Sequence, residues 1–276
     1  MATAPHRILN DGGSLPALGL GTAPMDDAQT ERAVTEALRT GYRLVDTGAS
    51  YGNEGGVGRA VAASDVPRDE VAVMTKLRGR DHGYEETLAA FEESRRRLRL
   101  EYVDFYLIHW PLPRLDRYIE SWKAMIRLRD DGLVRSIGVS NFTADQLTRL
   151  ERETGVLPAV NQIEMHPGFP QDKLRALHAE RDIATVCYSP LGRGNGLVND
   201  RGVIGVARTH SVTPAQVILR WHVQLGTVPV PRSGNPQRRR DNLDVFGFAL
   251  TEEEISLVGD GCHQRIGHDP EVHEEF

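Results

Sequence analysis

Short apolar runs alternate with longer amphipathic stretches along the chain, so that each candidate strand is followed by a candidate helix. The runs predict eight strands, at residues 17–21, 43–47, 71–76, 103–110, 136–141, 159–165, 183–189 and 227–233. The stretches predict helices at residues 27–40, 53–63, 83–98, 119–131, 143–154, 172–181, 203–225 (in two pieces) and 235–242. A hairpin signal with a Gly-rich turn, RILNDGGSLPAL, precedes the first strand. This order favours an α/β fold, the (β/α)8 TIM barrel with an N-terminal β-hairpin plugging the barrel bottom, over an open doubly wound sheet.

Length and charge narrow the class of protein. No linker or change in composition divides the 276 residues, so we expect a single barrel domain over residues 1–276. A net charge of -6 argues against nucleic acid or an anionic membrane surface as partner. The chain shows neither a signal peptide nor a long apolar segment, which predicts a cytoplasmic protein. Cys187 and Cys262, the two cysteines, have no metal-ligand spacing, so we expect neither a disulfide framework nor a metal site.

Polar side chains stand where the predicted strands end. In TIM barrels the loops after these ends surround the active site. Asp46, Lys76 and His109 end three of the strands, and Tyr51 follows Asp46 in the next loop. Any one of them alone would more often be a packing residue. Together, an acid, an ammonium, an imidazole and a phenol form a complete proton-transfer set and predict an active site.

The presence of a lysine at position 76, in a chain whose basic residues are nearly all arginines, supports this prediction. Of the 33 lysines and arginines, only Lys76, Lys123 and Lys173 are lysines. Lys123 and Lys173 lie on predicted helices and suit ordinary surface positions. At Lys76 a compact point charge fits beside a phenol where a broad guanidinium would not.

Several motifs occur in one characteristic order: GYRLVDTGASYGNEGGVGRA, VMTKL, EYVDFYLIHWP, SIGVSNF, VNQIEMHP and CYSPLG. Through them the chain resembles the aldo-keto reductase family over nearly its whole length, and within it the bacterial 2,5-diketo-D-gluconate reductase-like branch. The resemblance implies NADPH-dependent reduction of a small-molecule carbonyl (aldehyde, ketone or dicarbonyl) to an alcohol by hydride transfer. It also implies a monomer.

The resemblance implies a catalytic tetrad of Asp46, Tyr51, Lys76 and His109. Tyr51 would act as general acid, although a free phenol, with a pKa of about 10, gives up its proton reluctantly at neutral pH. The Lys76 ammonium would lower that pKa, and Asp46 would keep Lys76 charged and oriented. His109 would direct the carbonyl oxygen and donate a hydrogen bond as negative charge develops on it.

The segment VPVPRSGNPQRRRDN, residues 228–242, resembles the family's segment that binds the adenosine phosphates of NADPH. Arg232 replaces the usual lysine, but a phosphate accepts either cation. Arg238 would bind the 2′-phosphate, while Arg239 and Arg240 suit a solvated basic run. By resemblance the remaining cofactor contacts come from Ser140, Asn141, Gln162, Tyr188, Ser189, Leu191, Ser233 and Asn242. The GLG at residues 19–21 lacks the rest of a dinucleotide fingerprint and indicates close packing.

The substrate pocket is predicted to include Ala23, Arg78 and Trp110, with Arg78 favouring anionic or polyhydroxy carbonyl compounds. The tail, residues 261–276, should fold over its mouth. Its histidines, His263, His268 and His273, suit solvated or packing roles better than metal binding. Two rival functions remain. One is a non-catalytic NADPH-binding regulatory subunit of the same fold, and the other is a metal-dependent barrel hydrolase using His109, Glu164 and His166.

Overall fold

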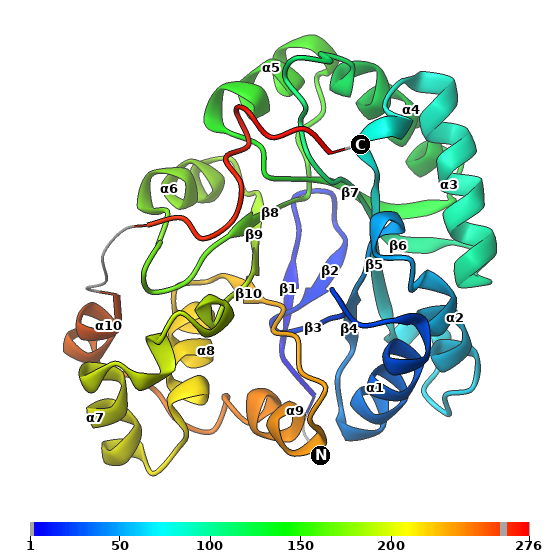
Figure 1. Ribbon diagram of the computed structural model, residues 1–276. Helices are drawn as coiled ribbons and strands as arrows, with labels where there is room; N and C mark the ends of the chain where they lie inside the picture. Colours follow the sequence, from blue (N-terminus) through cyan, green and yellow to red (C-terminus); the bar gives the residue numbers. More distant parts are fainter. Residues whose placement is uncertain (1–2, 260–263, 276) are drawn as a thin grey trace.

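The computed structural model describes residues 3–259 and 264–275. Eight parallel strands form one sheet in the order β10-β9-β8-β7-β6-β5-β4-β3. Backbone hydrogen bonds from Gly19 N to Pro229 O (3.0 Å) and from Gly21 N to Pro231 O (3.2 Å) join the two ends of this sheet. The sheet therefore closes into a barrel, and the predicted TIM barrel is confirmed (Figure 1). The strands are β3 (Leu20–Gly21), β4 (Leu44–Asp46), β5 (Ala72–Leu77), β6 (Val103–Ile108), β7 (Val134–Ser140), β8 (Val160–Glu164), β9 (Ala184–Tyr188) and β10 (Val228–Pro229).

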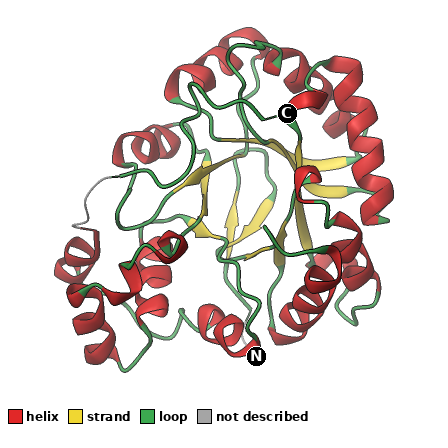
Figure 2. Ribbon diagram, viewed as in Figure 1, coloured by secondary structure: helices red, strands yellow, loops and turns green. Residues whose placement is uncertain are grey.

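Helices surround the barrel as an outer ring (Figures 1 and 2). Capping boxes begin three of them, at Asp26, Thr143 and Thr213. α10 was not predicted, because its first turn holds three glutamates and only Val258 is buried, which leaves little apolar periodicity to detect. The helices are α1 (Asp27–Thr40), α2 (Glu54–Ala62), α3 (Tyr84–Leu98), α4 (Tyr118–Asp130), α5 (Ala144–Thr154), α6 (Asp172–Glu180), α7 (Arg201–His210), α8 (Pro214–Gln224), α9 (Pro236–Leu243) and α10 (Glu252–Gly259).

The N-terminal hairpin closes one end of the barrel. Its strands, β1 (His6–Ile8) and β2 (Ser14–Pro16), pair antiparallel, and the hairpin lies at the centre of the ring in Figure 1. Leu9 and Leu15 are buried in the interior cluster that also contains Leu44 and Ala184, the first residues of two strands. The hairpin therefore plugs the bottom of the barrel, as predicted.

Two features of the strands have simple local causes. A Cβ added at Gly21 would lie 2.6 Å from the Val230 carbonyl oxygen, so the predicted close packing of the GLG segment is confirmed. β10 is much shorter than predicted. Pro229 and Pro231 lack the N–H that a central strand donates, which limits the regular ladder to two residues.

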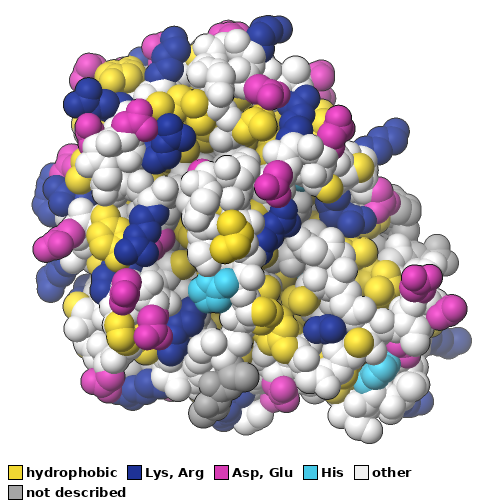
Figure 3. All heavy atoms as spheres, turned by 180° about the vertical axis from the view of Figure 1, so that it is seen from behind, with side chains coloured by type: hydrophobic (Ala, Val, Ile, Leu, Met, Phe, Trp, Pro, Cys, Tyr) yellow, Lys and Arg dark blue, Asp and Glu magenta, His cyan; other side chains and the backbone are white. Residues whose placement is uncertain are grey.

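The helices, the surface and the cysteines can be compared with the expectations from the sequence. In the described residues no helix is both long enough and apolar enough to cross a bilayer. Figure 3 shows basic and acidic side chains interspersed over the face seen from behind. Cys187 is a buried free thiol, whereas Cys262 and His263 lie outside the described residues.

Candidate active site

A cavity of about 820 Å³ opens at the carboxyl ends of the barrel strands. Asp46, His109, Gln162 and Tyr188 reach it from β4, β6, β8 and β9 or the residues directly after them. The structure thus brings together most of the side chains predicted from separate strand ends. The predicted site residues that line the cavity are Ala23, Asp46, Tyr51, His109, Trp110, Asn141, Gln162, Tyr188, Ser189, Leu191 and Arg232.

A buried ion pair forms the floor of the site. Lys76 is 0% exposed, and its Nζ donates to Asp46 Oδ1 at 2.6 Å and to the Thr47 carbonyl oxygen at 2.7 Å. Burial by itself lowers the pKa of Lys76, but Asp46 and Tyr51 outweigh it and the pKa is raised above its usual value. Gln162, predicted as a cofactor contact, donates to the same Asp46 oxygen at 2.8 Å. The ammonium is therefore charged at neutral pH and firmly oriented.

The Tyr51 ring lies directly above this ammonium, with Lys76 Nζ 5.0 Å from the ring centroid. Burial raises the pKa of the Tyr51 phenol, and the Lys76 charge opposes that rise without reversing it. The lowering expected from the Lys76 ammonium is therefore present, but desolvation of the phenol, which the sequence does not reveal, is larger. The phenol therefore stays protonated at neutral pH, as a proton donor must.

His109 shares a wall of the cavity with Tyr51, the two rings meeting edge to face with centroids 5.7 Å apart. Its Nδ1 lies 2.7 Å from Glu275 Oε1 in the tail and 3.3 Å from Ser50 Oγ. Neither Glu275 nor Ser50 was predicted. No local pattern marks Glu275, since its partner lies 166 positions earlier in the chain.

The side chains predicted to hold a nicotinamide form one network. Tyr188 Oη donates to Asn141 Oδ1 at 2.8 Å, and Asn141 Nδ2 donates to the His109 carbonyl oxygen at 3.0 Å. Ser140 is buried and its hydroxyl donates to the Gln162 carbonyl oxygen at 2.8 Å. Asn141 and Ser189 adopt φ values of 64° and 52°, a strained backbone conformation that is common at ligand sites. Hydrogen bonds within the protein therefore hold these side chains in place in and next to the cavity wall.

Two of the arginines predicted to bind the cofactor phosphates, Arg232 and Arg238, are exposed. Arg232 is exposed and lines the cavity, and Arg238 is exposed in the first turn of α9. Within the described residues, neither guanidinium has a hydrogen bond or an ion pair. Ser233 Oγ accepts from Asn235 N at 3.2 Å, and Asn242 is buried on α9. Arg232 at the cavity and Arg238 on the adjoining α9 are exposed cations of the kind that binds phosphate groups.

The position of Arg239 differs from the prediction. It was expected to be solvated, but it is 3% exposed and forms an ion pair with Glu36 of α1. Its Nη1 donates to the Ser233 carbonyl oxygen at 2.9 Å, and its own carbonyl oxygen accepts from Tyr42 Oη at 2.9 Å. Arg239 therefore fastens α9 to α1, because the helix turns this residue inward. Arg240 is exposed, as predicted.

Arg78 is also placed differently from the prediction. Its Nε pairs with Asp81 at 2.6 Å and its Nη2 lies 3.9 Å from Glu93 of α3. Among the described residues that line the cavity, Arg78 does not appear, whereas Ala23 and Trp110 do. Two carboxylates hold the guanidinium near α3, so the structure gives no support to a substrate contact by Arg78.

The described part of the tail, residues 264–275, lies over the cavity, as predicted, and is the red segment that crosses the strand ends in Figure 1. Glu164, at the end of β8, anchors it by accepting from Ile266 N (2.5 Å) and Gly267 N (2.7 Å). His268 and His273 stack with ring centroids 4.2 Å apart, and His273 packs against Trp110 at 4.3 Å. Both histidines line the cavity, so the tail forms part of its wall.

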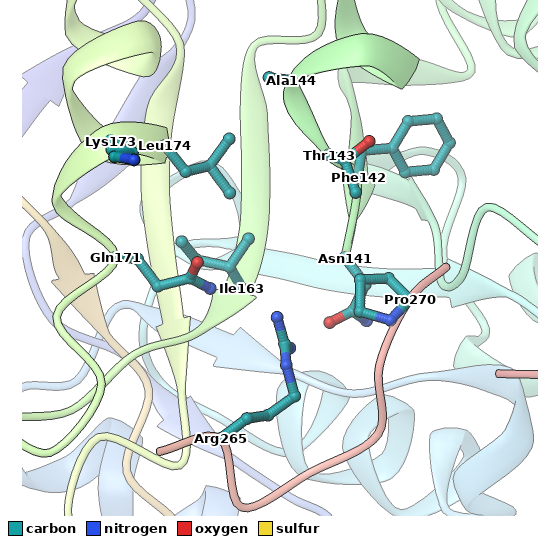
Figure 4. Close-up of a pocket in the computed structure, with 10 residues that line it drawn as sticks. All are labelled: Asn141, Phe142, Thr143, Ala144, Ile163, Gln171, Lys173, Leu174, Arg265 and Pro270. Atoms are coloured by element: carbon teal, nitrogen blue, oxygen red, sulfur yellow. The ribbon is translucent and has the colours of Figure 1, made fainter. Parts of the chain in front are cut away.

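A smaller cavity of about 230 Å³ adjoins the first and shares Asn141 with it. Figure 4 shows Arg265 and Pro270 of the tail on one side of this cavity, facing the starts of α5 and α6. Glu164, which the rival hydrolase would use, is engaged by the tail and by His166 Nε2 at 3.2 Å. The described residues contain no cluster of three or more metal-ligating side chains.

The structure is thus a (β/α)8 barrel with a buried lysine–aspartate pair beneath a tyrosine at the carboxyl ends of its strands. The model of the aldo/keto reductase family matches residues 16–203 and 203–260. The chain belongs to this family, and the resemblance seen in the sequence is confirmed.

Individual relatives agree with the family match. An aldo-keto reductase of Mycolicibacterium smegmatis is 49% identical, over 97% of this chain and 97% of its own. The 2,5-diketo-D-gluconic acid reductase B of a Corynebacterium species is 48% identical over 100% of both chains. A crystal structure of a Gox0644 mutant in complex with NADPH superposes with a TM-score of 0.93 and 42% identity, covering 99% of this chain and 100% of that one.

Proposed function

We propose that this chain is an NADPH-dependent aldo-keto reductase that reduces the carbonyl of a small aldehyde, ketone or dicarbonyl to an alcohol. The observation that carries the proposal is the Lys76 ammonium buried beneath the ring of Tyr51, which lines the cavity together with His109. The exposed arginines Arg232 and Arg238 and the NADPH complex of a 42% identical structure support the choice of cofactor. We also propose that the enzyme works as a monomer in the cytoplasm, as expected from the sequence.

NADPH, when bound, supplies the hydride that reaches the carbonyl carbon. Tyr51 donates its proton to the carbonyl oxygen, so that the C=O π bond gives way to new C–H and O–H bonds. The Lys76 ammonium stabilises the phenolate left behind, which recovers a proton from solvent. His109 orients the oxygen toward Tyr51. The Tyr188 ring and the Asn141 amide would hold the nicotinamide, and Arg232 and Arg238 would bind the phosphates.

Progress curves distinguish this reductase from the alternative of a non-catalytic NADPH-binding subunit. We expect continuous loss of NADPH absorbance, over many turnovers, with at least one compound in a panel of aldehydes, diketones and sugar-derived ketones. The 48% identity to a 2,5-diketo-D-gluconic acid reductase supports including sugar-acid diketones in the panel. A chelator should leave the rate unchanged. Consumption of no more than one NADPH per protein with every compound would favour the binding subunit.

Replacing Arg238 by alanine should lower the ratio of kcat/KM with NADPH to kcat/KM with NADH about 10–100-fold. A charge-assisted hydrogen bond to the 2′-phosphate would be lost, and NADH has no such phosphate. Arg240→Ala is the matched control, because Arg240 is an exposed arginine on the same helix and bonds only Gln237 among the described side chains. An unchanged ratio in Arg238→Ala would show that Arg238 does not select the cofactor.

A further inference from the structure

The tail places a carboxylate on the candidate catalytic histidine. Glu275 Oε1 lies 2.7 Å from His109 Nδ1, and Glu275 Oε2 accepts from Gly79 N at 3.1 Å. A Cβ at position 79 would overlap with the backbone oxygen of Glu275, so the close approach requires a glycine here. Both carboxylate oxygens are thus engaged by groups of the barrel mouth.

The charge on Glu275 decides where the histidine proton lies. Burial raises the pKa of Glu275, but its hydrogen bonds with His109, Ser50 and Gly79 outweigh this effect and hold the pKa below its usual value. Glu275 is therefore ionised at neutral pH and can only accept hydrogen bonds. Its contact with His109 then requires a proton on Nδ1.

A proton on Nδ1 leaves the other nitrogen of a neutral ring, Nε2, with a lone pair and no hydrogen to donate. Within the described residues Nε2 has no protein hydrogen-bond partner, and His109 lines the cavity. We propose that Glu275 is a positioning residue that holds the His109 proton on Nδ1, so that only the doubly protonated ring donates a hydrogen bond to the substrate carbonyl. This inference rests on the proposed reductase function.

Other charged groups face the same ring. Tyr51 packs against it edge to face, and Lys76, which pairs with Asp46 at 2.6 Å, lies over the Tyr51 ring. From the tail, His273 approaches across Trp110. Among the described carboxylates, Glu275 is the one in hydrogen-bond contact with the His109 ring. It is therefore the group whose removal should change the ring's protonation pattern.

The pH dependence of reduction tests the assignment. In the wild type we expect kcat/KM to be lower at alkaline than at neutral pH, because a neutral ring with its proton held on Nδ1 has no hydrogen on Nε2 to donate. In Glu275→Gln the side-chain amide can donate to Nδ1, which leaves a hydrogen on Nε2 of the neutral ring. The alkaline fall should then disappear over the same range. Glu274→Gln is the matched control, because Glu274 is the adjacent glutamate and lies 3.7 Å from the exposed Arg114.

A second readout requires no turnover. ¹⁵N NMR of the imidazole, assigned by its loss in His109→Gln, should show the neutral ring protonated on Nδ1 in the wild type and in Glu274→Gln. Glu275→Gln, and Gly79→Ala, which displaces the tail by its added methyl group, should shift the proton toward Nε2. Neutral wild-type His109 protonated on Nε2, or identical pH profiles in wild type and Glu275→Gln, would overturn the inference. Absence of turnover in the wild type would instead refute the proposed function and leave the NMR result standing.

Discussion

Tyr51→Phe is expected to lower kcat for carbonyl reduction about 10²–10⁴-fold, the contribution of a well-placed general acid. Phenylalanine keeps the ring above Lys76 but has no proton to give to the developing alkoxide. The affinity for NADPH, measured by quenching of protein fluorescence, should change little. This combination would show that the loss concerns the proton-transfer step and not the assembly of the cavity.

Tyr102→Phe is the matched control for this experiment. It removes a phenol hydroxyl that bonds Arg135 and does not line the cavity, so kcat should remain within about twofold of the wild type. Nearly full activity in Tyr51→Phe would show that another group supplies the proton, and the proposed mechanism would be wrong.

Lys76→Met should both abolish reduction and destabilise the protein by about 3–5 kcal/mol, the typical effect of removing one partner of a buried ion pair. The Asp46 carboxylate, which is 4% exposed, would retain Gln162 as its main partner and lose its countercharge. Denaturant titration followed by circular dichroism measures the free energy of unfolding, and NADPH oxidation measures the activity.

The double variant Asp46→Asn/Lys76→Met separates these two effects. With both charges removed, no buried carboxylate remains uncompensated, so much of the lost free energy of unfolding should return. Reduction should remain absent, because the phenolate would have no ammonium to stabilise it. If Lys76→Met were as stable as the wild type, the pair would not be the buried, mutually dependent unit described above.

The elements that could be predicted from the sequence are those with a strong local signal. α1 begins at a capping box and its bounds match the predicted range, because a side-chain cap and apolar periodicity act within a few residues. α10 was missed, since its acidic first turn and single buried residue resemble an exposed loop. β10 was overextended because periodicity does not report the donors that its prolines lack.

The candidate site shows the same division. Asp46, Tyr51 and Lys76 could be located because parallel strands bring their carboxyl ends to one mouth whatever the details of packing. Arg78 and Arg239 could not be placed, because the direction of a long side chain depends on carboxylates from other elements. In this structure Asp81 and Glu93 hold Arg78, and Glu36 holds Arg239.

By itself the sequence determined the order of strands and helices, the family, and which polar residues stand at the strand ends, since these follow from neighbouring residues and chain order. Only the tertiary structure decided that burial outweighs Lys76 at the Tyr51 phenol and that Glu275 reaches His109. Desolvation sums over every atom packed around a group, and a contact across 166 positions depends on how the closed barrel directs the tail. Neither the desolvation of Tyr51 nor the contact between Glu275 and His109 can therefore be predicted from a short stretch of the sequence.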